Sequence, residues 1–214
     1  AGKPEHVMNL MRFIAQEVRE IMAELGFRTI DELVGRTDVL EQKQTRHWKA
    51  RKLDLSALLW QAEGPRKFEQ PQDHGLEQSL DYRVLLPIGR KAWESKNPVY
   101  GRLFIRNTDR AAGTMLGSEL TSRLGAEGLP EHAIHFHLQG SAGHSFGAFL
   151  PKGITLTLEG EAGDGVGKGL SGGKLAIYPD AKSRYRAEEQ VIIGNAAFYG
   201  AVAGEAYILG QAGE

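Results

Sequence analysis

The chain has 214 residues, a length that suits one large domain or two smaller ones. Hydrophobic residues make up 41% and charged residues 25%, the composition of a folded globular protein. The formal net charge of −1 gives no electrostatic reason to expect a nucleic-acid partner or an anionic membrane surface. No run approaches the roughly 18 apolar residues that span a bilayer, so we expect a cytoplasmic protein. The lack of cysteine excludes disulfides, thiolate-held iron–sulfur clusters and a cysteine nucleophile within these residues.

The first part of the chain has a helical pattern. Apolar residues recur at helical spacing over residues 4–25, Pro4 suits a first turn, and Gly26 suits the left-handed position that follows a helix. Thr29 followed by Glu32 is a capping-box pattern, which predicts a short second helix ending near residue 35.

The next part is polar and less regular. Residues 41–52 are basic, but a nucleic-acid interpretation is weak because Trp48 is their only aromatic residue. Proline and glycine predict a long connecting loop over residues 63–75. Helical spacing resumes over residues 76–93, where Pro87 is expected to interrupt the helix.

Glycine changes the composition near the middle of the chain. Of the 27 glycines, 6 lie in residues 1–100 and 21 in residues 101–214. A strand is expected over residues 99–105 and a helix near residues 112–124, before the glycine-rich part begins.

A repeat then dominates the sequence. Ile134, Phe136 and Leu138 alternate with polar residues, and twenty residues later Ile154, Leu156 and Leu158 do the same. The glycines share this offset: Gly140 with Gly160, Gly143 with Gly163, and Gly147 with Gly167. The pattern continues less strictly through Leu175, Ile177, Val191 and Ile193, and Gly200 and Gly204 then match the second and third glycines of the set.

Stacking explains such a repeat. A coil of about twenty residues cannot bury its apolar face alone, whereas stacked coils place Ile134 over Ile154 and Leu138 over Leu158 in a continuous core. Glycine suits corners that need positive φ or close backbone approach. We therefore expect an α+β protein, with N-terminal helices followed by a right-handed single-stranded β-helix that is truncated at its C-terminus.

Two local motifs allow sharper interpretations that the repeat weakens. Residues 167–172 match G-x-G-x-x-G, but a dinucleotide site also needs a helix to follow, and the next residues suggest a strand. His132, His135, His137 and His144 lie close in the sequence, and His135 and His137 share a strand face as a metal-binding pair would. Outward-facing positions on a solenoid explain these histidines more simply, and we assign no metal site.

The segments over residues 140–150, 160–173 and 194–205 closely resemble the C-terminal domain of the large subunit of glutamate synthase. Asn107-Thr-Asp-Arg-Ala-Ala-Gly113 looks like the entry to that domain, and residues 2–7, 17–19 and 35–38 look like the last helices of its flavin-binding barrel. The chain departs from the family at Gly163, where an Asn is common before Asp164, so any side-chain role of that Asn is in doubt.

The resemblance implies a function for the intact subunit. It makes glutamate from glutamine and 2-oxoglutarate, using FMN, a 3Fe–4S cluster, and electrons from a small subunit or ferredoxin. The resemblance implies no catalytic residue, cofactor or metal within this chain, which is expected to be inactive alone. Its role would be to hold the amidotransferase and flavin parts of the large subunit in fixed relation.

The same resemblance suggests three regions. Residues 1–53 would be the end of the FMN-binding barrel, residues 54–98 a helical linker, and residues 99–214 an incomplete glycine-repeat domain. An incomplete last coil also predicts a homo-oligomer formed through its uncovered end. A free-standing β-helix binding or assembly module of a multisubunit oxidoreductase is the alternative, and a metal enzyme built on the histidines is a third.

Overall fold

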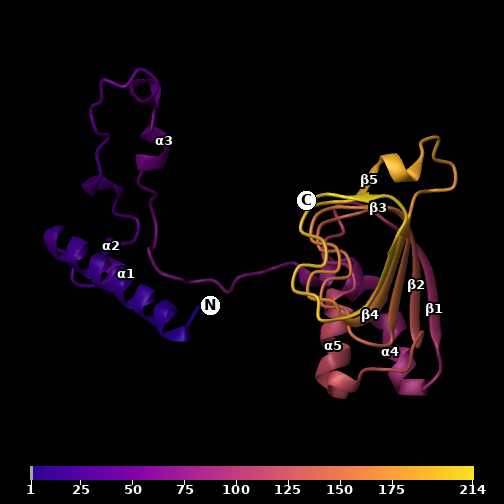
Figure 1. Ribbon diagram of the computed structural model, residues 1–214. Coiled ribbons are helices and arrows are strands. Elements are labelled where there is room, and N and C mark those ends of the chain that lie inside the picture. Colours follow the sequence, from indigo (N-terminus) through magenta and orange to yellow (C-terminus); the bar gives the residue numbers. More distant parts are fainter. Residues whose placement is uncertain (1) are drawn as a thin grey trace. The chain divides into compact units, whose positions relative to one another are not determined.

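The computed structural model describes residues 2–214, and these form two compact units, residues 2–73 and residues 74–214. Each unit has its own set of elements (Figure 1). The three regions expected from the resemblance, with boundaries at residues 53 and 98, are family domains and not compact units. This division stays a prediction.

The first unit is helical and has little interior. It contains α1 (Pro4–Glu24), α2 (Ile30–Leu33), α3 (Ser56–Leu59) and 3₁₀ turns at Thr37–Val39 and Ala50–Lys52. The predicted start and stop of α1 are confirmed, because Pro4 lies in its first turn and Gly26 has a φ of 79°. Of residues 2–73, only Met22 is buried, so the apolar face of α1 is exposed.

The predicted cap of α2 is also confirmed. The Thr29 Oγ1 accepts a hydrogen bond from the Glu32 amide at 3.3 Å. The Glu32 carboxylate in turn accepts one from the Arg28 amide at 2.9 Å, one residue earlier than the ideal capping box places it.

The second unit begins with helices and ends with parallel strands. Its helices are α4 (Leu86–Ser95) and α5 (Thr114–Leu124), with a π-helical turn at Asp81–Leu85 and 3₁₀ turns at Leu76–Gln78, Gly125–Glu127 and Ala187–Glu189. Its strands are β1 (Val99–Ile105), β2 (Ile134–Ala142), β3 (Ile154–Ala162), β4 (Ser171–Tyr178), β5 (Val191–Ile193), β6 (Ala203–Ile208) and β7 (Gln211–Ala212).

Pro87 corrects one expectation. The helix predicted over residues 76–93 was expected to break at this proline, but Pro87 lies in the first turn of α4. The helical backbone runs without a break over residues 80–95, so Pro87 does not end the helix. The irregularity associated with it is the π-helical turn Asp81–Leu85 directly before α4.

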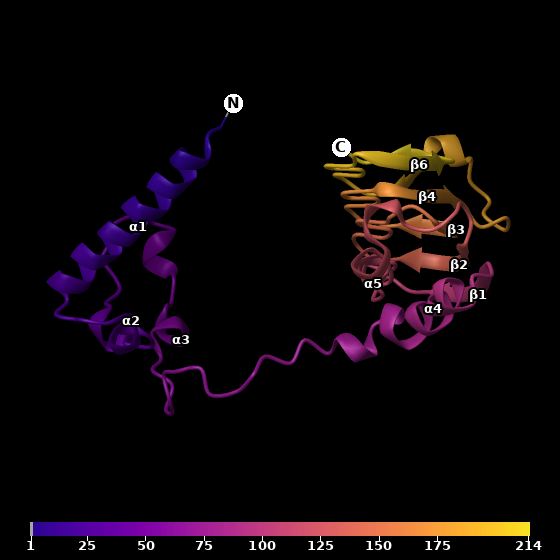
Figure 2. The same cartoon turned by 90° about the horizontal axis from the view of Figure 1, so that it is seen from below.

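The strands form one parallel sheet in the order β1-β2-β3-β4-β6, with β5 pairing β3 and β7. Figure 2 shows β2, β3, β4 and β6 stacked in that order. The twenty-residue register is confirmed, since Ile134 pairs with Ile154 and Leu138 with Leu158.

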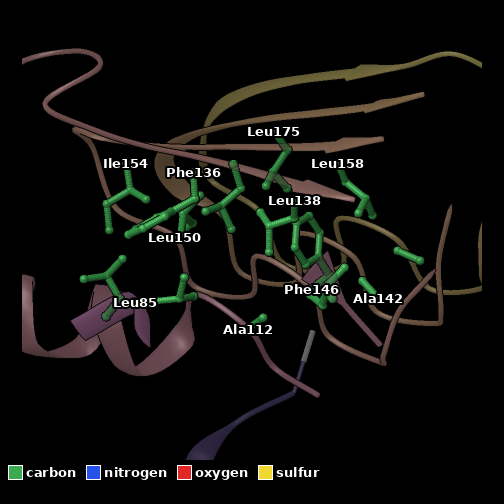
Figure 3. Packing of buried hydrophobic residues seen from close by; sticks show 14 of the residues in the cluster. Leu85, Ala112, Phe136, Leu138, Ala142, Phe146, Leu150, Ile154, Leu158 and Leu175 are labelled. Carbon is green, nitrogen blue, oxygen red and sulfur yellow. The ribbon is translucent and has the colours of Figure 1, made fainter. Parts of the chain in front are cut away.

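The core lies on the inner side of this sheet. Phe136, Leu156 and Leu175 follow one another across three strands and have no exposed surface. Phe146 and Leu150, from the segment between β2 and β3, close the same interior (Figure 3). Further members of the cluster come from the helices: Leu85, Leu86, Leu116 and Leu120.

Candidate functional site

The first predicted glycine column lies where β1, β2 and β3 meet side by side. Gly140 pairs with Gly160, and their φ angles are 130° and 151°. A Cβ on Gly160 would collide with the carbonyl oxygen of Gly140, and one on Gly140 would collide with the carbonyl oxygen of Ile105. Both positions therefore need glycine for close backbone approach as well as for φ.

In the second column Gly143 needs glycine for space, whereas a Cβ on Gly163 would lie 3.3 Å from the His144 amide nitrogen, a tight contact rather than a collision. Gly143 and Gly163 do not have positive φ, but a Cβ on Gly143 would lie 2.6 Å from the Asn107 carbonyl oxygen. The Gly163 amide donates to the Ala142 carbonyl at 3.2 Å, and the Gly194 amide donates to the Ala162 carbonyl at 3.1 Å. Gly194 is therefore the next member of this column, which the sequence interpretation missed.

The third column contains Gly147 and Gly167, with φ angles of 65° and 59°. Its next member is Phe198, which has a φ of 57° and donates its amide to the Val166 carbonyl at 2.7 Å. A Cβ on Gly167 would lie 2.6 Å from the Phe198 ring, so the small residue makes room for the large one.

Gly200 and Gly204 occupy other places than the sequence match gave them. Both have positive φ, but Ala203 pairs with Ser171, which puts Gly204 at the start of a strand rather than at a corner of the earlier columns. Gly163 and Gly194 are 31 residues apart instead of 20, because residues 179–190 add a segment between β4 and β5. That insertion lengthens the spacing between equivalent glycines, so counting at a constant period assigns Gly200 and Gly204 to the wrong positions.

A polar ladder runs beside the second glycine column. The Asp164 Oδ1 accepts a hydrogen bond from the Asn195 amide at 2.8 Å, and the Asn195 Oδ1 accepts one from the Glu214 amide at 3.0 Å. Each side chain thus holds the backbone of a turn that follows later in the chain. Gly163 has no side chain that could bind the next turn, and the neighbouring Asp164 makes the hydrogen bond to Asn195.

The four histidines have four different partners, although His135 and His137 line one hollow. The contacts of their ring nitrogens are Thr155 Oγ1 at 3.2 Å for His132, Thr157 Oγ1 at 2.9 Å for His135, Glu159 Oε2 at 3.6 Å for His137, and Asp164 Oδ2 at 3.7 Å for His144. Over residues 2–214, no group of three His, Asp or Glu side chains could hold a metal ion. The geometry therefore does not support a metal centre at these histidines.

His135 and His137 border a hollow on the outer face of the sheet. The hollow has a volume of about 350 Å³ and is also lined by Tyr100, Gly101 and Arg102. Burial lowers the pKa of His135, and the neighbouring His132 and His137 add to this effect. His135 therefore tends to stay neutral, and Arg102 is the permanent charge of the hollow.

The glycine repeat places the chain in a known family. The family described as the GXGXG motif matches residues 82–214. The chain belongs to this family. It is 54% identical to the glutamate synthase [NADPH] large chain of Bacillus subtilis and 44% identical to glutamate synthase [NADH] of Saccharomyces cerevisiae. It is 38% identical to ferredoxin-dependent glutamate synthase 2 of Synechocystis.

Each of these similarities covers the whole of this chain but little of its relative. The chain spans 14% of the Bacillus subtilis protein, 10% of the Saccharomyces cerevisiae protein and 14% of the Synechocystis protein. The relatives therefore contain a segment like this one among much longer sequences.

A buried carboxylate lies just before the start of the GXGXG match. Asp81 is 3% exposed, and it accepts hydrogen bonds from the amides of Gly113 and Met115 at 2.8 Å and of Leu116 at 3.0 Å. These amides open α5, where unpaired N–H groups attract a negative charge. Burial raises the pKa of Asp81, and the three amide donors oppose that rise. Asp81 thereby joins the π-helical turn to α5.

Two other expectations concern cofactors and membranes. The G-x-G-x-x-G motif at residues 167–172 runs directly into β4, which begins at Ser171. A dinucleotide-binding site needs a helix after this motif, and here a strand follows instead. Within residues 2–214, no helix is both long and apolar enough to cross a membrane.

Proposed function

We propose that the chain is the C-terminal part of a glutamate synthase large chain, acting as a scaffold for the production of glutamate from glutamine and 2-oxoglutarate. The observation that carries this proposal is similarity over the whole chain to glutamate synthases whose names specify NADPH, NADH or ferredoxin. Because relatives with three different donors share this segment, its role is best explained as independent of the donor. We also propose a cytoplasmic location for the protein.

The finer architecture is part of the same proposal. We infer that residues 99–214 are a right-handed β-helix, residues 1–53 the end of a flavin-binding barrel, and residues 54–98 their linker. The in-register pairing of β2 with β3 and the three corner columns support stacked coils. The exposed apolar face of α1 supports a helix that packs on a part of the protein outside these residues.

The cofactors of the intact enzyme belong elsewhere in this scheme. The chain has no cysteine, so it offers no thiolate for a 3Fe–4S cluster, and residues 2–214 contain no other metal-ligating group of three. The residues present therefore do not fit the cluster. We expect the isolated chain to bind no FMN and to hydrolyse no glutamine; retained flavin absorbance would contradict this.

A scaffold works by fixing the distance between the catalytic parts that it joins. Ammonia released by one catalytic part must reach the other, and a misplacement of about 1 Å can cost about 100-fold in rate. A rigid stack suits this task because each coil is fixed to the next by strand pairing, glycine corners and the ladder from Asp164 to Asn195.

The test uses the intact large chain with Gly160→Ala, which introduces the collision with Gly140, and Gly200→Ala as control. Gly200 has a φ of 70° and open space around its missing Cβ, so the control carries a positive-φ strain of its own without the collision. The scaffold predicts that Gly160→Ala lowers glutamine-dependent glutamate formation more than glutamine hydrolysis or ammonia-dependent synthesis measured separately. Equal losses in all three activities would contradict a positioning role.

A second candidate is a self-assembling module built on the same stack. The exposed Tyr199 (71%) and Val202 (83%) near β6 favour this reading, since apolar residues at an open end promote association. Mass determination in solution separates the two: the scaffold predicts association with the rest of the large chain, and the module predicts a defined homo-oligomer of this chain alone.

A further inference from the structure

Strand β1 ends the main path of the sheet, and one of its edges faces no described strand. Among residues 2–214, its strand partner is β2 alone. The Val99 amide donates to the Ala133 carbonyl at 2.9 Å, which sets the alternation of hydrogen bonding along β1. The backbone groups of Val99, Gly101 and Leu103 therefore face β2, and those of the residues between them face the opposite edge.

The side chains of those intervening residues are open as well. Tyr100 is 69% exposed and Phe104 is 78% exposed, and Arg102 between them is also exposed. In the described part of the chain, Arg102 takes part in no ion pair or hydrogen bond with another side chain. Within the described chain, the edge backbone thus lacks a strand partner, and although the Tyr100 ring lies 6.0 Å from the His135 ring, Arg102 has no carboxylate opposite it.

Proteins usually protect such an edge with proline, a bulge, a covering element or charges. The seven residues of β1, Val99–Ile105, contain no proline and pair with β2 without a register shift. Arg102 is the one charged side chain of the strand. An open strand edge with two exposed aromatic residues and a single charge is the kind of edge that strand addition uses.

The hollow next to the edge indicates the charge of the partner. Arg102, His135 and His137 line it, and Arg102 is its permanent positive charge. Glu159 lies on β3, two strands away from β1, and its carboxylate lies 3.6 Å from the His137 Nε2, so it faces that histidine. An incoming carboxylate opposite Arg102 would meet an unpaired guanidinium.

We propose that the free edge of β1 binds an extended acidic segment by strand addition. Its carboxylate lies opposite Arg102, and apolar side chains two residues to either side lie against Tyr100 and Phe104. A second copy of this chain fits less well, because two-fold pairing of β1 with itself centred on Arg102 would set two guanidiniums opposite each other.

The probe is a capped, fluorescently labelled peptide of the same seven-residue length as β1. It alternates threonine with valine, glutamate and valine, and a second peptide has lysine in place of glutamate. Binding to the full 214-residue chain is followed by anisotropy, and amide hydrogen exchange is measured by NMR. The proposal predicts that the glutamate peptide slows exchange at Tyr100, Arg102 and Phe104, whose amides face the open edge.

Charge reversal tests the assignment of Arg102. Arg102→Glu should lower the affinity for the glutamate peptide by about tenfold, because like charges then face each other, and raise the affinity for the lysine peptide, because opposite charges then do. Lys168→Glu, an exposed charge change at a coil corner away from β1, should leave both peptides unchanged. Circular dichroism of both variants checks that the fold is kept.

Three outcomes would overturn the proposal. The first is no slowing of exchange at the three edge amides under saturating peptide. The second is equal affinity for the glutamate and lysine peptides. The third is slowed exchange at the edge that depends on protein concentration without peptide, which would identify a second copy as the occupant.

Discussion

Asp81 offers the sharpest test of how the second unit is held together. Its carboxylate accepts three amide hydrogen bonds from the start of α5, across more than thirty residues of sequence. Replacing it with alanine leaves those amides without an acceptor in a site that is 3% exposed in the native protein. The change should therefore destabilise the junction between the π-helical turn and α5.

The magnitude follows from the number of bonds and the cost of burial. Hydrogen bonds to a charged acceptor contribute about 1.5–3 kcal/mol each, and three of them exceed the effect of an ordinary helix cap. The burial that raises the pKa of Asp81 offsets part of this gain. We expect Asp81→Ala to lower the free energy of unfolding by about 3 kcal/mol. Asp81→Asn, which keeps one acceptor oxygen, should lie between alanine and the native residue.

Urea unfolding followed by the fluorescence of Trp93, which lies in α4, measures this change. Trp48 and Trp60 are 60% and 69% exposed in the first unit and are replaced by phenylalanine in every protein compared. Glu77→Ala, an exposed carboxylate close by in sequence, is the matched control and should change stability by less than about 0.5 kcal/mol. A loss below about 1 kcal/mol for Asp81→Ala would refute the reasoning.

Two further predictions concern the corners and an ion pair. In the isolated chain, Gly160→Ala should cost at least about 2 kcal/mol more than Gly200→Ala in urea unfolding, because only the former adds a backbone collision to the strain of positive φ; equal losses would show that the Gly140 contact is unimportant. Arg90 holds the pKa of Glu119 below its usual value through a hydrogen bond of 2.7 Å. The stability that Glu119 contributes over Glu119→Gln should be constant at pH values well above the ordinary pKa of a glutamate and decline as the pH falls through the lowered pKa; a difference that grows in acid would contradict this.

Local patterns in the sequence were enough to predict most elements. The ends of α1 and the cap of α2 depend on residues within one or two turns, and the pairing of Ile134 with Ile154 follows from a strict repeat. Strand β6 was missed because Ala203–Ile208 lacks a clear alternation of apolar and polar residues. The wrong places for Gly200 and Gly204 came from an insertion whose length no local pattern reveals.

The remaining features depend on contacts between distant segments. Nothing around Asp81 indicates that its partners lie at residues 113–116, since the sequence carries no local record of that contact. The open edge of β1 likewise follows from its pairing with β2 and from the exposure of its side chains. Such features need the structure, because a side chain's partner across the fold is set by topology rather than by spacing.

In the proposed scaffold role, this chain holds two catalytic parts of a larger enzyme in fixed relation. A cryo-electron microscopy map of the intact large chain shows whether it does. We expect residues 99–214 to contact both the amidotransferase and the flavin-binding parts, with the apolar face of α1 packed within the latter. A map in which residues 99–214 touch neither part, or in which α1 remains exposed, would contradict it.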